Sequence, residues 1–168
     1  SILTSNNFQE VQTLSFVNND KNFLFNPEKK YVQVFNAIDQ SSKFMRSNLM
    51  SSLIDVYKLN YDQNNLSNSY FEINTVFDTS KNKNYEDVPN QNIVLGFLTS
   101  SNLSNTDTRL KDQELDLYYV KNILNQLLSS YDLEPITKPG FHQNYSFSII
   151  KNGQIIHESV REALINTE

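Results

Sequence analysis

The dipeptide Asn152-Gly153 is the strongest constraint on the fold of this chain. It stands between two short segments rich in apolar residues, 145–150 and 154–156. A type I′ turn needs positive φ at both central residues, so Asn-Gly between such segments is the strongest short-range signal for a β-hairpin. We therefore expect an antiparallel pair of strands near the C-terminal end of the sequence.

Other strands and helices are predicted from the spacing of apolar residues. β-Branched and aromatic residues predict strands over 8–17, 31–35, 70–77 and 93–99. The last of these is almost entirely apolar, so we expect it to be covered on both faces. Helical spacing predicts helices over 41–60 and 115–131, with a short terminal helix over 160–165. Interspersed strands and helices with a hairpin indicate an α+β fold, a largely antiparallel sheet flanked by helices.

Length and glycine and cysteine content limit the kind of protein this can be. The 168 residues suit a single domain, 1–168. Only 3 glycines occur, and no glycine-rich phosphate loop or dinucleotide fingerprint is present. Cysteine is absent, which excludes disulfides, thiolate metal sites and a cysteine nucleophile. No serine lies in a nucleophile-elbow pattern.

The charge distribution argues against broad binding to nucleic acid. The net charge is −5, with 14 Lys and Arg scattered among 19 Asp and Glu. The densest basic spots, Lys29-Lys30 and Lys81 to Lys83, are short and are interpreted as solvated surface. No apolar run approaches the ~18 residues that suggest a transmembrane helix. We therefore expect neither DNA nor a membrane as a partner.

Glu72 is the most interesting carboxylate, because it lies in the middle of a predicted strand between Phe71 and Ile73. An isolated acid on a sheet face could orient a substrate. Two structural interpretations compete with that one, and we favour them. Glu72 is either an edge or solvent-facing residue, or a buried acid paired with a basic residue such as Arg46.

The remaining ionisable candidates have structural interpretations. Asp112, Glu114 and Asp116 precede the second predicted helix, where negative charge complements the helix N-terminus. His142 and His157 flank the hairpin without a clear acidic partner, so they do not predict a metal site. A general-acid role for His142 is weighed against packing between a loop and a strand, which we favour. From the residues alone, we expect no catalytic, cofactor-binding or metal-binding residue in this chain.

Four stretches, in order along the chain, resemble one family. They are 8–17 (FQEVQTLSFV) with Phe25-Asn26-Pro27, 45–54 (MRSNLMSSLI), 71–77 (FEINTVF) and 138–142 (KPGFH) with the hairpin that follows. The second and third resemble the family segments "LRTSLLPGLL" and "FEIGRVF". Together they are similar to the core, catalytic-like module of the β subunit of bacterial phenylalanyl-tRNA synthetase. Departures from the family pattern include Ser51, Asn74 and Thr75.

The resemblance implies a class II aminoacyl-tRNA synthetase-like antiparallel sheet flanked by helices, without catalysis. A working site of that class uses an arginine after the strand that corresponds to 70–77, where this chain has Asp78-Thr79. The resemblance also implies that ATP and Mg bind in the catalytic α subunit of a cytoplasmic α2β2 heterotetramer, and that none binds here. The partners it implies are the α subunit, other β-subunit domains and, through at most a few contacts, tRNA. On this interpretation the chain is a fragment of a longer β subunit.

Two other classes of function stay open at this point. One is a free-standing synthetase-like paralogue that binds an amino acid or regulates another protein. The other is an unrelated hydrolase or binding protein, which a catalytic pocket with acid pairs around Glu72 would favour.

Overall fold

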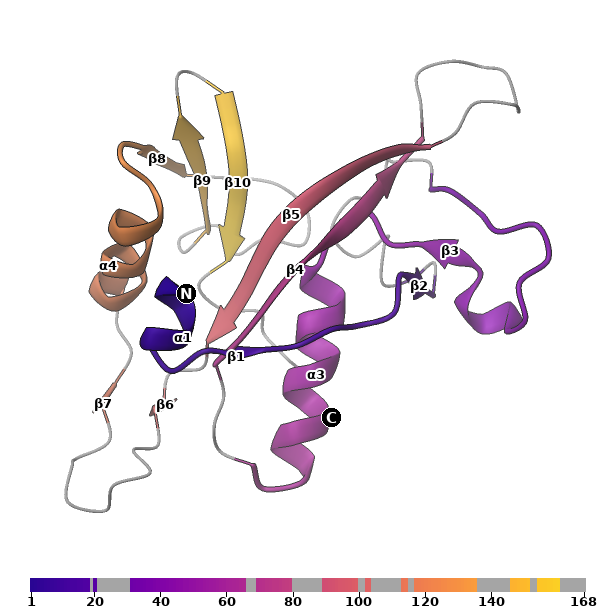
Figure 1. Ribbon diagram of the computed structural model, residues 1–168, viewed down its shortest axis with the longest axis horizontal. Coiled ribbons are helices and arrows are strands. Elements are labelled where there is room, and N and C mark those ends of the chain that lie inside the picture. The colour runs from indigo at the N-terminus through magenta and orange to yellow at the C-terminus, as the bar shows by residue number, and fades with distance from the viewer. Residues whose placement is uncertain are drawn as a thin grey trace.

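A long antiparallel hairpin organises the fold (Figure 1). The computed structural model describes residues 1–18, 20, 31–65, 69–79, 89–99, 102–103, 113–114, 117–135, 146–151 and 154–160. Strand β4 (Ser69–Asp78) pairs with β5 (Asn90–Thr99) over ten residue pairs, with Glu72 opposite Gly96. On its other side β4 pairs in parallel with the short strand β1 (Gln9–Glu10). This gives a three-stranded sheet in the order β1-β4-β5.

Helix α3 (Met50–Asp62) covers one face of this sheet. Leu49 and Leu53 pack there against Tyr70 and Val76 of β4. The approach is close, because a Cβ added at Gly96 would lie 3.0 Å from the Leu49 Cβ and 3.1 Å from a Leu53 methyl carbon. The absence of a side chain at Gly96 therefore allows α3 to pack closely on the sheet.

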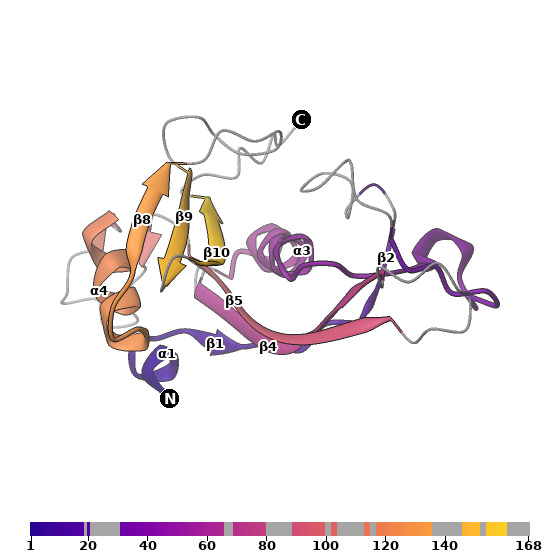
Figure 2. The same cartoon turned by 90° about the horizontal axis from the view of Figure 1, so that it is seen from above.

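The opposite face of the sheet is covered at one end by two helices, α1 (Ile2–Ser5) and α4 (Leu117–Leu127). The buried residues of this second core are Leu3, Phe8, Phe71 and Ile123. The rings of Phe8 and Phe97 meet edge to face, with centroids 5.8 Å apart. Figure 2 shows α3 and α1 on opposite sides of the β4–β5 ribbon. The sheet thus lies between two apolar clusters.

Smaller sheets surround this centre. Strands β8 (Asp132–Pro135), β9 (Ser146–Lys151) and β10 (Gln154–Val160) form an antiparallel sheet in the order β10-β9-β8. Strands β2 (Phe16–Val17) and β3 (Phe44–Met45) pair antiparallel, as do β6 (Asn102–Leu103) and β7 (Gln113–Glu114). A 3-10 turn, η1 (Gln40–Ser42), precedes β3.

The α+β fold, the strands over 70–77 and 93–99 and the hairpin around Asn152-Gly153 are confirmed. The second predicted helix is confirmed as the shorter α4, and 132–135 forms a strand that the sequence did not predict. The full coverage predicted for 93–99 is wrong at its start, since Ile93 is 78% exposed. The predicted helix over 160–165 is wrong at Val160, which ends β10, and the rest lies outside the described residues.

Three predicted elements near the N-terminal side are wrong in extent. The single strand over 8–17 is two short strands, because the Thr13 N–H donates to the Glu72 carboxylate instead of to a neighbouring strand. The segment 31–35 forms one isolated bridge, Gln33 to Phe44, instead of a strand. The helix predicted from 41 begins at Met50, because residues 44–46 are extended and pair with neighbouring segments.

Candidate functional site

A fully buried ion pair joins Arg46 to Glu72 at the centre of the molecule. The Arg46 Nη1 atom lies 3.1 Å from Oε1 of Glu72, and neither side chain is exposed to solvent. Arg46 precedes α3, and Glu72 lies on the α3 side of β4. Of the interpretations left open for Glu72, the buried acid paired with Arg46 is the one that the structure confirms.

Further hydrogen bonds reach both charged groups, although Nη2 of Arg46 is buried without a hydrogen-bond partner among the described residues. Glu72 accepts from the Thr13 backbone N–H at 3.0 Å, the Thr13 hydroxyl at 2.8 Å and the Asn74 amide at 2.8 Å. Arg46 donates through Nε to the Thr75 carbonyl at 3.0 Å and through Nη1 to the Thr13 hydroxyl at 2.8 Å. The donors and acceptors come from three segments far apart in sequence, 13, 46 and 72–75, so the ion pair ties the N-terminal segment to β4.

These contacts set the protonation state of Glu72. Burial by itself raises the pKa of a carboxyl group. Here the hydrogen bonds from Thr13 and Asn74 and the positive charge of Arg46 outweigh that effect and hold the pKa of Glu72 below its usual value of 4.5. Glu72 is therefore ionised at neutral pH. Glu72 cannot act as a general base toward solvent, because its side chain is buried and its carboxylate already accepts hydrogen bonds from Thr13, Asn74 and Arg46.

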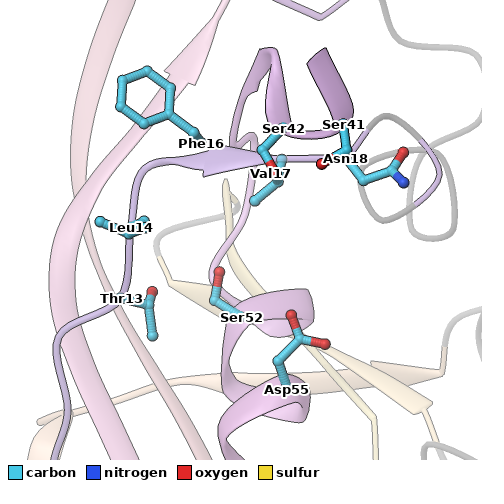
Figure 3. A pocket seen from close by; sticks show the side chains of 9 residues that line it. All are labelled: Thr13, Leu14, Phe16, Val17, Asn18, Ser41, Ser42, Ser52 and Asp55. Carbon is cyan, nitrogen blue, oxygen red and sulfur yellow. The ribbon is translucent and has the colours of Figure 1, made fainter. Parts of the chain in front are cut away.

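A separate pocket lies beside this ion pair, with Thr13 contributing to both (Figure 3). Its volume is about 370 Å³. One wall is the chain from Thr13 to Asn18, a second is formed by Ser41 and Ser42 of η1, and the floor is formed by Ser52 and Asp55 of α3. Among the described residues that line it, Asp55 is the one with a charged side chain.

Two of the other sequence-predicted candidates, Glu114 and His157, belong to strands that contain neither Arg46, Glu72 nor a residue that lines the pocket. Glu114 belongs to β7 and not to the first turn of α4, which contains no acidic residue. His157 lies in β10, opposite Ile149. Asp112, Asp116, His142, Lys29-Lys30 and Lys81 to Lys83 lie outside the described residues.

Sequence analysis missed the pocket and the role of Thr13 as a partner of Glu72. The signal for the floor was present, since Ser52 and Asp55 are polar residues three positions apart and therefore share one side of a helix. In the part of the chain that the structure describes, no group of three or more potential metal ligands occurs. Within the same residues, no helix is long and apolar enough to cross a membrane.

Comparison with known proteins gives a consistent result. The family model described as "Phenylalanyl tRNA synthetase beta chain CLM domain" matches residues 1–157. A phenylalanine–tRNA ligase beta subunit of Carboxydothermus hydrogenoformans is 31% identical over 175 aligned residues, which cover 100% of this chain and 20% of the relative. The corresponding subunit of Aster yellows witches'-broom phytoplasma is 24% identical, over an alignment that covers 92% of this chain and 18% of the relative. This chain thus spans about a fifth of the length of these curated relatives.

Solved structures show the same fold at low identity. Pyrrolysyl-tRNA synthetase from Desulfitobacterium hafniense superimposes with a TM-score of 0.57 at 13% identity, covering 92% of this chain and 53% of that protein. A second structure of a pyrrolysyl-tRNA synthetase from the same organism gives a TM-score of 0.55 at 14% identity, covering 92% and 50%. The fold is therefore that of a class II aminoacyl-tRNA synthetase domain.

Proposed function

The chain belongs to the family of the phenylalanyl-tRNA synthetase beta chain CLM domain, and from this membership we propose that it is a noncatalytic structural module of a phenylalanine–tRNA ligase beta subunit. The observation that carries the proposal is the family match over residues 1–157. In this proposal the module packs on the catalytic α subunit of a cytoplasmic α2β2 enzyme. The α subunit binds ATP and Mg²⁺, activates phenylalanine and charges tRNA.

The state of Arg46 supports the absence of catalysis. Cationic side chains that bind phosphate need to reach the ligand with free N–H donors. Arg46 is the one arginine among the described residues, and it is fully buried against Glu72 and the Thr75 carbonyl. Its guanidinium therefore serves the interior of the module and is not accessible to a nucleotide.

The chemistry of the pocket supports the same conclusion. Of the side chains that the structure describes along its lining, Asp55 is the one that carries a charge. A carboxylate repels the phosphates of ATP, and within the described part of the chain no cation lines the pocket to offset that repulsion. The described lining of the pocket therefore does not suit a nucleoside triphosphate.

Exposed apolar side chains support a role in assembly. Ile73 and Ile93 lie on the face of β4 and β5 opposite α3, in diagonal positions of the register, and are 56% and 78% exposed. Phe35 and Ile38, in the segment before η1, are fully exposed. Large apolar side chains that stay exposed in groups are typical of protein interaction surfaces.

Phenylalanine-dependent ATP–pyrophosphate exchange tests the absence of catalysis. We expect no exchange with this chain alone and normal exchange with the reconstituted α and β subunits. Exchange by this chain alone, dependent on phenylalanine and comparable to that of the reconstituted enzyme, would contradict the proposal.

The two competing classes of function are less well supported. The free-standing paralogue is not favoured, because the curated relatives are beta subunits and the match covers the whole chain. An unrelated hydrolase with acid pairs around Glu72 is excluded by the family match and by the pairing of Glu72 with Arg46.

A further inference from the structure

An arm of the chain projects at one end of the molecule. It consists of residues 32–45, which run outward, turn at η1 and return through β3 (Figure 1). Figures 1 and 2 both show it at the opposite end of the long axis from the N-terminus and α1. The arm carries Phe35 and Ile38, which are the two most exposed large apolar side chains among the described residues.

Hydrogen bonds between its two sides hold the base of the arm together. The Val34 N–H donates to the Lys43 carbonyl at 2.9 Å, and the Met45 N–H donates to the Val32 carbonyl at 2.8 Å. The next residue is Arg46, whose main chain and side chain bond to the segments described above. The arm therefore leaves the body of the molecule from a fixed base.

Further hydrogen bonds shape the tip of the arm. Oδ1 of Asp39 accepts from the Ser41 N–H at 2.8 Å, and Oδ2 accepts from the Ser41 hydroxyl at 2.6 Å. The Asp39 carbonyl accepts from the Ser42 N–H at 3.2 Å. Polar groups thus fix the turn that presents Phe35 and Ile38 to solvent. Anchoring side chains on an ordered frame lose less conformational entropy when they bind, which favours affinity.

The chemistry of the tip indicates an apolar protein surface as the partner. Residues 33–42 contain one ionisable side chain, Asp39, and it accepts the hydrogen bonds just described. The cation of the arm, Lys43, lies at the base, with Nζ 5.7 Å from the centroid of the Phe44 ring. Cores of protein interfaces are depleted of charge and enriched in aromatic residues, whereas nucleic acid is bound mainly through Lys and Arg.

We propose that this arm anchors the module to the α subunit, with Phe35 and Ile38 entering an apolar pocket of that subunit. The inference rests on the proposed function, because it assumes the same partner. The place of the arm favours a separate chain as its occupant. A segment of a longer β subunit joined at Ser1 would start from the other end of the molecule.

Substitutions in the full-length β subunit, co-expressed with the α subunit, test the inference. Phe35→Ser and Ile38→Ser change fully exposed side chains, so the variants should fold with an unchanged Tm. We expect the double variant to weaken the complex about tenfold or more, measured by light scattering over a dilution series. Leu59→Ser, at an exposed position of α3, is the matched control and should bind as the unchanged subunit does. Equal affinity of the arm variant and the control would overturn the inference.

Thiol labelling of this chain gives a second readout. The sequence contains no cysteine, so Asn36→Cys introduces a single thiol at an exposed position beside Phe35. We expect the α subunit to slow maleimide labelling of this thiol about tenfold or more, and to leave the labelling of Leu59→Cys unchanged. Equal labelling of Asn36→Cys with and without a bound α subunit would contradict the contact. Protection of Asn36→Cys by a second copy of this chain, or in the full-length β subunit alone, would assign the arm to another occupant.

The two proposals fail in different ways. Unchanged β subunit that forms the complex, together with an arm variant that forms it equally well, overturns the inference and leaves the proposed function standing. Failure of this chain alone to bind the α subunit counts against the proposed function, and the variants of the full-length β subunit still decide the role of the arm.

Discussion

Nη1 of Arg46 lies 3.1 Å from Oε1 of Glu72 in the interior of the molecule, where both side chains are inaccessible to solvent. Removing two charges from water is costly, so such a pair persists only when further hydrogen bonds satisfy it. Thr13, Asn74 and the Thr75 carbonyl provide most of those bonds, and Nη2 of Arg46 is left without a partner among the described residues. Arginine is a residue type that binds phosphate when it lies on a surface. Here Arg46 instead links the N-terminal segment to the sheet.

Breaking this pair from one side should be strongly destabilising. We expect Arg46→Met to lower the free energy of unfolding by about 3–5 kcal/mol, because Glu72 is left charged and buried. Urea denaturation at pH 7 measures the change.

The double variant Arg46→Met with Glu72→Gln provides the control, because it removes both charges. Its loss should be smaller than the sum of the two single losses by about 0.5–3 kcal/mol. Strict additivity would contradict a direct interaction between the two side chains.

The low pKa of Glu72 gives stability a defined pH dependence. A carboxyl group whose pKa is lowered by folding contributes stability that is present above its unfolded pKa and is lost as pH falls through its folded pKa. The unfolded value is near 4.5, so this contribution should fade below that pH. Thermal unfolding from pH 7 to pH 3 should show a steeper fall for the unchanged chain than for Glu72→Gln. Parallel curves would show that Glu72 does not titrate differently in the two states.

Gly96 should not tolerate a side chain. Alanine normally suits a strand interior at least as well as glycine does. Here its Cβ would lie 3.0 Å from the Leu49 Cβ, so α3 must shift, and we expect a loss of about 1–3 kcal/mol from overpacking. Asn92→Ala, at an exposed position of the same strand, is the control. Equal stability of the two variants in urea denaturation would mean that α3 does not approach β5 as closely as described.

Leu53 should contribute more to stability than Leu59, although both lie on α3. Leu53 is 1% exposed and Leu59 is 60% exposed. We expect Leu53→Ala to cost about 2–5 kcal/mol. Leu59→Ala should stay within about 0.5 kcal/mol of the unchanged chain. Similar melting temperatures for the two variants would contradict the assignment of the buried face of α3.

Local sequence signals predicted the elements whose residues bond mainly within their own hairpin or helix. The β9–β10 hairpin follows from Asn152-Gly153, and β4 and β5 follow from their β-branched and aromatic content. Pairing of Glu72 with Arg46 was one of the open interpretations, because a buried acid in a strand needs a partner.

The remainder depends on contacts between distant segments. The predicted strand over 8–17 is interrupted where Thr13 bonds Glu72, 59 positions away. The helix predicted from 41 begins only at Met50, because the Arg46 N–H donates to the Ser15 carbonyl and the Arg46 carbonyl accepts from the Phe77 N–H. The pocket was missed for the same reason, since its walls come from three separate segments. Periodicity in one segment contains no information on such pairings.

Co-expression of this chain with the phenylalanyl-tRNA synthetase α subunit of the same organism tests the central claim most directly. Size exclusion with light scattering then measures the mass of each eluting species, with the full-length β subunit as the positive control. We predict that this chain co-elutes with the α subunit as one complex. Separate elution of this chain and the α subunit, under conditions where the full-length β subunit does form the complex, would contradict a structural role for this module at that interface.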